Sequence, residues 1–201
     1  MGPARDKGWG VASGASPAGL TRFPTAAAGN SGEVMDERAL RIWCIRAGER
    51  SEAEVMFLGG TVALDGEDLG DLSSIPNNLA AFKQRFRTVF PGEVAGTTSR
   101  WARQYLQFVH EVERQDWIVY KSKRTQMVHF GHITGAYRFQ PQAGLDHAHL
   151  RPVRWVGSQP WGTLGPLAKK ALSSRAGFCG LKSELNDVLA AIARLNPTTG
   201  A

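Results

Sequence analysis

The chain has 201 residues, of which 42% are hydrophobic and 21% charged, and its excess of Lys and Arg gives a formal net charge of +6. This length holds one domain of ordinary size and a tail. The positive excess favours an anionic partner such as nucleic acid, although surplus arginine is also common in proteins from GC-rich genomes. No apolar run reaches the length of a membrane span, and the first residues lack the order of a signal peptide. These features argue against a membrane or secreted protein and predict a cytoplasmic one.

The two cysteines also favour a cytoplasmic protein. Cys44 lies in an apolar strand and Cys179 in the sequence Gly-Phe-Cys-Gly, without the clustered spacing of a zinc site or of a secreted disulfide framework. Both are therefore predicted to be reduced thiols.

The N-terminal segment is rich in Gly, Ala, Ser and Pro and contains few large apolar groups, so burial cannot offset the entropy of ordering it. We expect residues 1–35 to form a plain disordered leader, which is favoured over two alternatives: a tether, and a start codon misassigned upstream of Met35. Order is predicted to begin with a strand at Arg41–Ile45, then a short turn or helix at Glu54–Leu58, a strand ending at Leu64, and a polar loop over 65–74.

Two amphipathic helices are predicted next. The first opens at Pro76-Asn-Asn, ends before Pro91-Gly92 and has a buried stripe formed by Leu79, Phe82, Phe86 and Val89. Thr98 or Ser99 is expected to cap the second, whose apolar face consists of Trp101, Tyr105, Phe108 and Val112. Such a face must pack on another element, and a helix capping a small barrel is the simplest solution.

The second helix runs into a predicted hairpin, with strands at Trp117–Tyr120 and Met127–Ile133 and a basic loop over 121–126. Leu150–Val156 reads as an edge or terminal strand because it contains Pro152. A turn-rich stretch follows, and apolar residues at helical spacing predict a final helix containing Leu181, Leu185, Val188, Ile192 and Leu195. The expected organisation is a leader over 1–35, one domain over 36–157, and a turn-rich segment with a C-terminal helix over 158–201.

Several segments carry a family resemblance: Arg41–Glu49, Trp101–Val109, Gln115–Val119, Gly131–Tyr137 and His149–Trp155. Together they resemble the amino-terminal domain of Mrr-type predicted restriction endonucleases and, more distantly, the EVE and YTH branch of the PUA-like superfamily. The likeness covers about residues 41–156. It implies an α+β protein with a small twisted PUA-like (EVE-like) β-barrel and flanking helices, which holds a flipped, often methylated base in an aromatic pocket. This chain has Gln115-Asp116 where the family usually has Gly-Asp, and we expect its residues after Val156 not to form a nuclease domain.

The arrangement of the acidic residues argues against catalysis. A restriction-type core needs clustered carboxylates and a lysine around a divalent metal, and no such array is evident, since Lys182-Ser-Glu184 reads as a surface helix start. The cluster at 65–71 is either a metal loop or a solvated loop, and it lacks the ligand spacing of a calcium site. His147 and His149 share a strand face that could suit a metal, but a structural role is favoured because no third ligand is evident. We therefore expect no enzyme activity, no cofactor and no metal.

Candidate binding residues follow from the resemblance and from side-chain chemistry. Tryptophans can stack on a flipped base or fill a core, and Arg46-Ala-Gly48 leaves the first strand where the resemblance places contacts to the base edge. The predicted base pocket consists of Trp43, Arg46, Ala47, Gly48, Ser99, Trp101, Gln104 and Tyr120. The predicted phosphate-binding residues are Arg100, Arg103, Lys121, Lys123 and Arg124.

These features predict a nucleic-acid-binding module, with DNA favoured over RNA, that reads a modified base in a prokaryotic restriction or antiviral defence setting. The alternative is a protein-interaction or regulatory module that recruits a separate nuclease. A hydrolytic enzyme is a third, remote option.

Overall fold

The computed structural model describes residues 41–141, 147–173, 176–181 and 185–195, which belong to one compact unit. The leader expected over 1–35 lies outside the described residues. Among the described helices, none combines the length and the apolar character needed to cross a membrane.

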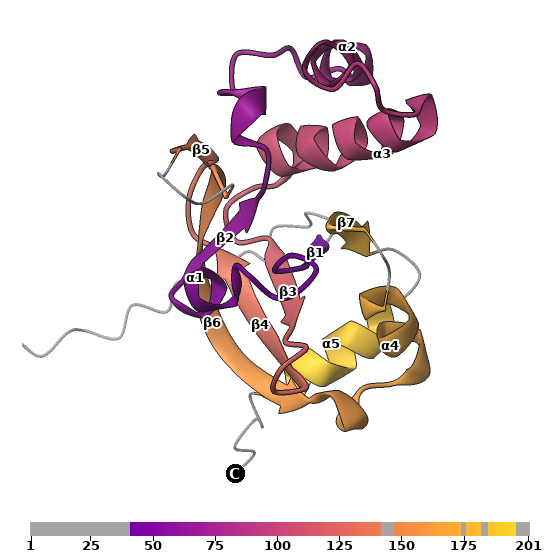
Figure 1. The fold of residues 1–201 in the computed structure, drawn as a ribbon. Helices are drawn as coiled ribbons and strands as arrows, with labels where there is room; N and C mark the ends of the chain where they lie inside the picture. The colour runs from indigo at the N-terminus through magenta and orange to yellow at the C-terminus, as the bar shows by residue number, and fades with distance from the viewer. Residues whose placement is uncertain (1–40, 142–146, 174–175, 182–184, 196–201) are drawn as a thin grey trace, which may run out of the picture. The chain divides into compact units, whose positions relative to one another are not determined.

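A mixed sheet organises the described residues, with strand order β2-β6-β4-β3-β1-β7 and β5 paired to β6 (Figure 1). Only β1 and β3 run parallel; the other pairs are antiparallel. The strands are β1 (Ile42–Ile45), β2 (Thr61–Leu64), β3 (Trp117–Lys121), β4 (Met127–Ile133), β5 (Arg138–Phe139), β6 (His149–Pro160) and β7 (Phe178–Leu181). The helices are α1 (Glu54–Leu58), α2 (Leu79–Val89), α3 (Ala95–Leu106), α4 (Pro166–Leu172) and α5 (Leu185–Ala193). Short turns complete them: 3₁₀ turns η1 (Glu67–Leu69) and η3 (Trp161–Thr163), and the π-helical turn η2 (Gln107–Glu111), which continues α3.

The long strand β6 curls the sheet. Its first residues pair with β2 and its later residues with β4, where the register shifts between Phe130 and Gly131. Gly131 is required there because a Cβ would lie only 2.8 Å from the Arg154 carbonyl oxygen. The predicted α+β class, with a curved sheet and flanking helices, is confirmed.

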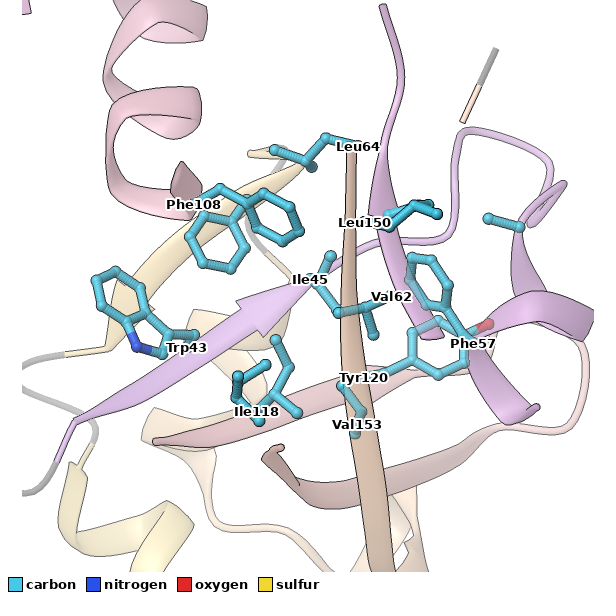
Figure 2. Packing of buried hydrophobic residues seen from close by; sticks show 14 of the residues in the cluster. Trp43, Ile45, Phe57, Val62, Leu64, Phe108, Ile118, Tyr120, Leu150 and Val153 are labelled. Carbon is cyan, nitrogen blue, oxygen red and sulfur yellow. The ribbon is translucent and has the colours of Figure 1, made fainter. Parts of the chain in front are cut away.

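Both faces of the sheet are covered. On one face Trp43 and Ile45 pack with Phe57 of α1 and Phe108 of η2, as Figure 2 shows. On the other face Ile42 and Cys44 belong to a second cluster that includes apolar residues of α4 and α5. A third cluster joins α2 to α3. Strands covered on both sides carry apolar residues at every position, so the alternation that would assign faces from sequence is lost.

Three boundaries differ from the sequence expectation. Helix α3 begins at Ala95, before the predicted caps, and the Thr98 hydroxyl donates back to the Val94 carbonyl at 3.3 Å. Leu181, predicted in the final helix, pairs with Ile42 as part of β7. The expected domain boundary at residue 157 falls within β6.

Pro152 does not mark an edge, because β6 has β2 on one side and β4 on the other. The proline is tolerated since pairing with β4 starts one residue later, at Val153, so no hydrogen bond of that ladder needs its missing N–H.

A buried arginine joins β6 to the end of the α3–η2 helix. Arg151 is 3% exposed, and its guanidinium donates to the carbonyls of Phe108 at 2.7 Å, Val109 at 3.0 Å and Gly135 at 3.2 Å. The last carbonyls of a helix have no partner within the helix, so the guanidinium satisfies groups that would otherwise be buried without a donor. Burial lowers the pKa of Arg151 to about 10, which leaves it charged at neutral pH.

Replacement of this guanidinium should therefore be costly. Arg151→Met leaves three carbonyls without their donor, and we expect the free energy of unfolding in urea to fall by about 3 kcal/mol. Arg154→Met is the matched control, because Arg154 is exposed on the same strand, and should change stability by no more than about 0.5 kcal/mol. Equal effects of the two substitutions would contradict this stabilising role of the Arg151 guanidinium.

Candidate functional site

A groove of about 780 Å³ lies between α3 and the segments that follow β1 and β2. Predicted site residues from two distant segments meet in it: Arg46 and Gly48 after β1, and Arg100, Trp101 and Gln104 on α3. The other lining residues are Glu49, Ala63, Leu64, Asp65, Tyr105 and Gly177. This volume lies within the range of about 300 to 1,000 Å³ that is usual for small-ligand sites.

Helix α3 supplies an aromatic wall. Trp101 and Tyr105 are one turn apart, so both reach the same face of the helix. Behind the groove, the Trp101 ring lies 6.4 Å from the Phe86 ring and 6.0 Å from the Phe90 ring. The Tyr105 hydroxyl donates to the Asp65 carbonyl, which ties α3 to the segment after β2. Tyr105 was missed by the sequence analysis, which assigned it to the apolar face of the helix.

The side chain of Gln104 attaches helix α3 to the sheet. Its Oε1 accepts from the Phe178 N–H at 3.0 Å, and its Nε2 donates to the Arg100 carbonyl at 3.4 Å. Both polar ends of the side chain are engaged, so Gln104 positions α3 against β7.

The opposite wall is a tight turn after β1. The Arg46 N–H donates to the Gly177 carbonyl at 2.9 Å, and Gly48 adopts a left-handed φ of 83°. A Cβ on Gly48 would also collide with the carboxylate of Glu52, which accepts from the Arg50 N–H. The turn thereby places Arg46 among the residues that line the groove.

The groove carries charges of both signs. Arg46, Arg100, Glu49 and Asp65 are all among its lining residues. Asp65 also contacts the nearly buried His147 through Oδ1 and Nδ1. Such a lining offers donors, acceptors and a flat apolar surface within one site.

Three residues of the predicted base pocket lie in the core instead. Trp43 stacks on Phe178 with ring centroids 5.2 Å apart and donates from Nε1 to Asp116 Oδ2 at 2.8 Å. Tyr120 is 1% exposed, and burial raises its pKa to about 12. Ala47 is buried as well. Figure 2 shows Trp43 and Tyr120 among the packed side chains of β1 and β3. Ser99 is on α3 and does not line the groove.

The predicted phosphate-binding residues divide among separate places. Lys121 and Lys123 line a second cavity of about 290 Å³, which Arg46 also lines. Lys121 lies 3.7 Å above the Trp161 ring, and Lys123 donates to the Glu49 carbonyl. Burial lowers the pKa of Lys121. Arg124 pairs with Glu54 at 3.4 Å, and Arg103 is exposed on α3. Arg46 is thus the residue shared by the groove and the cation-lined cavity.

His149 and His132 have structural partners. His149 Nε2 is 2.9 Å from the Gly66 carbonyl and therefore carries the proton, so Nδ1 accepts from the Tyr137 hydroxyl at 2.8 Å. His132 Nδ1 is 3.0 Å from the Gln115 carbonyl. Within the described ranges, no group of three or more His, Cys, Asp or Glu side chains is placed to hold a metal ion.

Comparison with known proteins gives one family and a distant structural likeness. The family described as "Domain of unknown function (DUF8426)" matches residues 43–177. The chain matches no curated protein. Among solved structures, it is similar to the YTH domain of the Zygosaccharomyces rouxii MRB1 protein in complex with N6-methyladenosine RNA, at 10% identity and a TM-score of 0.39. That match covers 77% of this chain and 87% of the other. The resemblance to Mrr-type endonucleases stays a prediction.

The turn at Gly48 can be tested by stability. Gly48→Ala forces a left-handed backbone on a residue with a Cβ and displaces Glu52, so we expect a loss of about 1 to 2 kcal/mol in urea unfolding. Gly92→Ala is the control, since a Cβ there meets nothing within 4 Å. If Gly48→Ala is as stable as Gly92→Ala, this account of the turn is wrong.

Proposed function

The chain belongs to the DUF8426 family, and we propose that it is a nucleic-acid-binding module whose groove holds one unstacked base. The observation that carries the proposal is the meeting of Trp101, Arg46 and Arg100 in a single groove. These residues come from separate parts of the chain, and together they supply a stacking surface and positive charge.

The chemistry of the lining suits a nucleobase. A base is flat and carries both donors and acceptors on its edge, and stacking on an aromatic side chain contributes about 1 to 3 kcal/mol per base. Carboxylates such as Asp65 and Glu49 accept from exocyclic amino groups, while guanidinium groups donate to ring nitrogens and carbonyls. A base held in a duplex stack cannot present its face and edge in this way, so the ligand is a flipped or single-stranded nucleotide.

The cavity next to the groove suits the sugar-phosphate backbone. Lys121 and Lys123 line it together with Arg46, which also lines the groove. A base beside Trp101 would place its flanking phosphate towards these cations, in keeping with the general division between phosphate contacts that position and base contacts that specify.

Two further features support a modified base in DNA. Ala63 and Leu64 add apolar surface to the groove, against which a methyl group would be buried. The resemblance of the sequence to the amino-terminal domain of Mrr-type endonucleases supports DNA as the polymer and a role in prokaryotic restriction or defence. In this proposal the chain binds without catalysis, and cleavage is left to a separate nuclease.

Arg46 gives the first test. Arg46→Ala should weaken binding of a short single-stranded oligonucleotide about tenfold, because a hydrogen bond to a charged group contributes about 1.5 to 3 kcal/mol. It should also reduce the slope of log affinity against log salt by about one. Fluorescence anisotropy measures both. Arg87→Ala, which removes an exposed charge from α2, should leave both unchanged, and loss of affinity in both variants alike would refute a specific role for Arg46.

Trp101 tests base recognition. Trp101→Leu keeps an apolar contact with Phe86 and removes the ring available for stacking, so binding should weaken about tenfold or more. The probes are DNA and RNA oligonucleotides with one 5-methylcytosine, one N6-methyladenine or the plain base. Trp117→Leu, at a half-buried tryptophan outside the groove, is the control.

If the Trp101→Leu protein is folded and binds every probe with the affinity of the parent protein, the groove does not hold the base. The protein-interaction module would then be the better account.

A further inference from the structure

Two cysteines face each other across a pair of strands. Cys44 of β1 and Cys179 of β7 are partners in the antiparallel register, and their Sγ atoms are 2.9 Å apart. Directly opposed antiparallel residues have Cα atoms about 4.5 to 5.5 Å apart, which falls within the range of about 4.4 to 6.8 Å found in disulfides. The backbone therefore already has the spacing that a cross-link needs.

The pair lies at a cavity, although Cys44 itself is only 5% exposed. Cys179 is only partly buried, and Cys44 lines the second cavity together with Arg46, Lys121 and Lys123. Among the described residues that line this cavity there is no carboxylate. Neighbouring cations stabilise a thiolate, which is the reactive form of cysteine.

We propose that Cys44 and Cys179 form a reversible disulfide when the protein meets a hydroperoxide. The Cys44 thiolate attacks one peroxide oxygen, so an S–O bond forms and the O–O bond breaks, giving a sulfenic acid and hydroxide. The Cys179 thiolate then attacks the Cys44 sulfur, the S–S bond forms and the S–O bond breaks, and the sulfenic oxygen leaves as hydroxide. The two protons that the thiols released on ionisation convert the two hydroxides to water. In total, two thiols lose two electrons and two protons, and the hydroperoxide is reduced by two electrons; hydrogen peroxide yields two waters.

The cross-link acts on one wall of the groove. β7 is paired with β1 at the end of the strand order, and its residue Phe178 donates to Gln104 on α3. A disulfide fastens this strand to β1 and, through Gln104, secures α3. Because a cross-link restricts the unfolded chain, the oxidised protein unfolds at a higher urea concentration than the reduced protein.

Intact mass spectrometry of the full chain tests the proposal. The reduced protein is treated with hydrogen peroxide, denatured and exposed to N-ethylmaleimide. We expect both alkylation sites to be lost with a mass decrease of about 2 Da, reversal by dithiothreitol, and a proteolytic fragment in which Cys44 is linked to Cys179. Retention of two alkylated cysteines, oxidation to sulfinic acid instead, or linkage between chains would overturn the proposal.

Single variants test the order of events without any nucleic acid. Cys179→Ser should stop at the sulfenic acid, so that dimedone labels Cys44 after peroxide treatment, whereas Cys44→Ser should take up little dimedone. Stronger labelling in Cys44→Ser would contradict the assignment of Cys44 as the attacking thiolate. These readouts do not depend on the proposed binding function, so either proposal can fail while the other stands.

Discussion

The buried guanidinium of Arg151 is the contact on which the placement of α3 depends. It projects from β6, in the interior of the sheet, to the last carbonyls of the α3–η2 helix, with hydrogen bonds of 2.7 and 3.0 Å. A buried charge is costly to desolvate, and the carbonyl dipoles at a helix C-terminus offset part of that cost. The helix end is thus fixed to the sheet, and everything that α3 carries is oriented by that attachment.

The groove follows from this placement. α3 is attached to the sheet at its end by Arg151 and within the helix by Gln104, and Tyr105 ties it to the segment after β2. Between these attachments Trp101 and Arg100 face the turn that carries Arg46. Rigid support on several sides is what a recognition site requires, because a side chain that must be ordered on binding costs affinity. The fold therefore holds the Trp101 ring in place beside a groove that Arg46 and Arg100 also line.

Part of this arrangement could be predicted from the sequence. The remaining features could not be predicted, for physical reasons. The helical spacing of α3 is a local feature and could be predicted, whereas Trp101 and Arg46 are singled out as pocket candidates because of the family resemblance. The core positions of Trp43 and Tyr120 could not, because β1 and β3 are covered on both faces and show no alternation. β7 is a short strand containing glycine, and its pairing with β1 joins distant parts of the chain, so the meeting of Cys44 with Cys179 left no local signal. The sequence Arg151-Pro-Val-Arg154 does not indicate which arginine is buried, and only the contacts of Arg151 with η2 show it.

The location of the binding site is tested most directly by nuclear magnetic resonance. Uniformly ¹⁵N-labelled protein is titrated with a short single-stranded oligonucleotide, and the backbone amide and indole N–H signals are followed. The account predicts that the Trp101 indole and the amides of Arg46 and Gly48 shift with the oligonucleotide concentration, while the buried Trp43 indole, bonded to Asp116, keeps its position. Saturable shifts confined to other surfaces, with Trp101 and Gly48 unaffected, would contradict the claim that this groove holds the base.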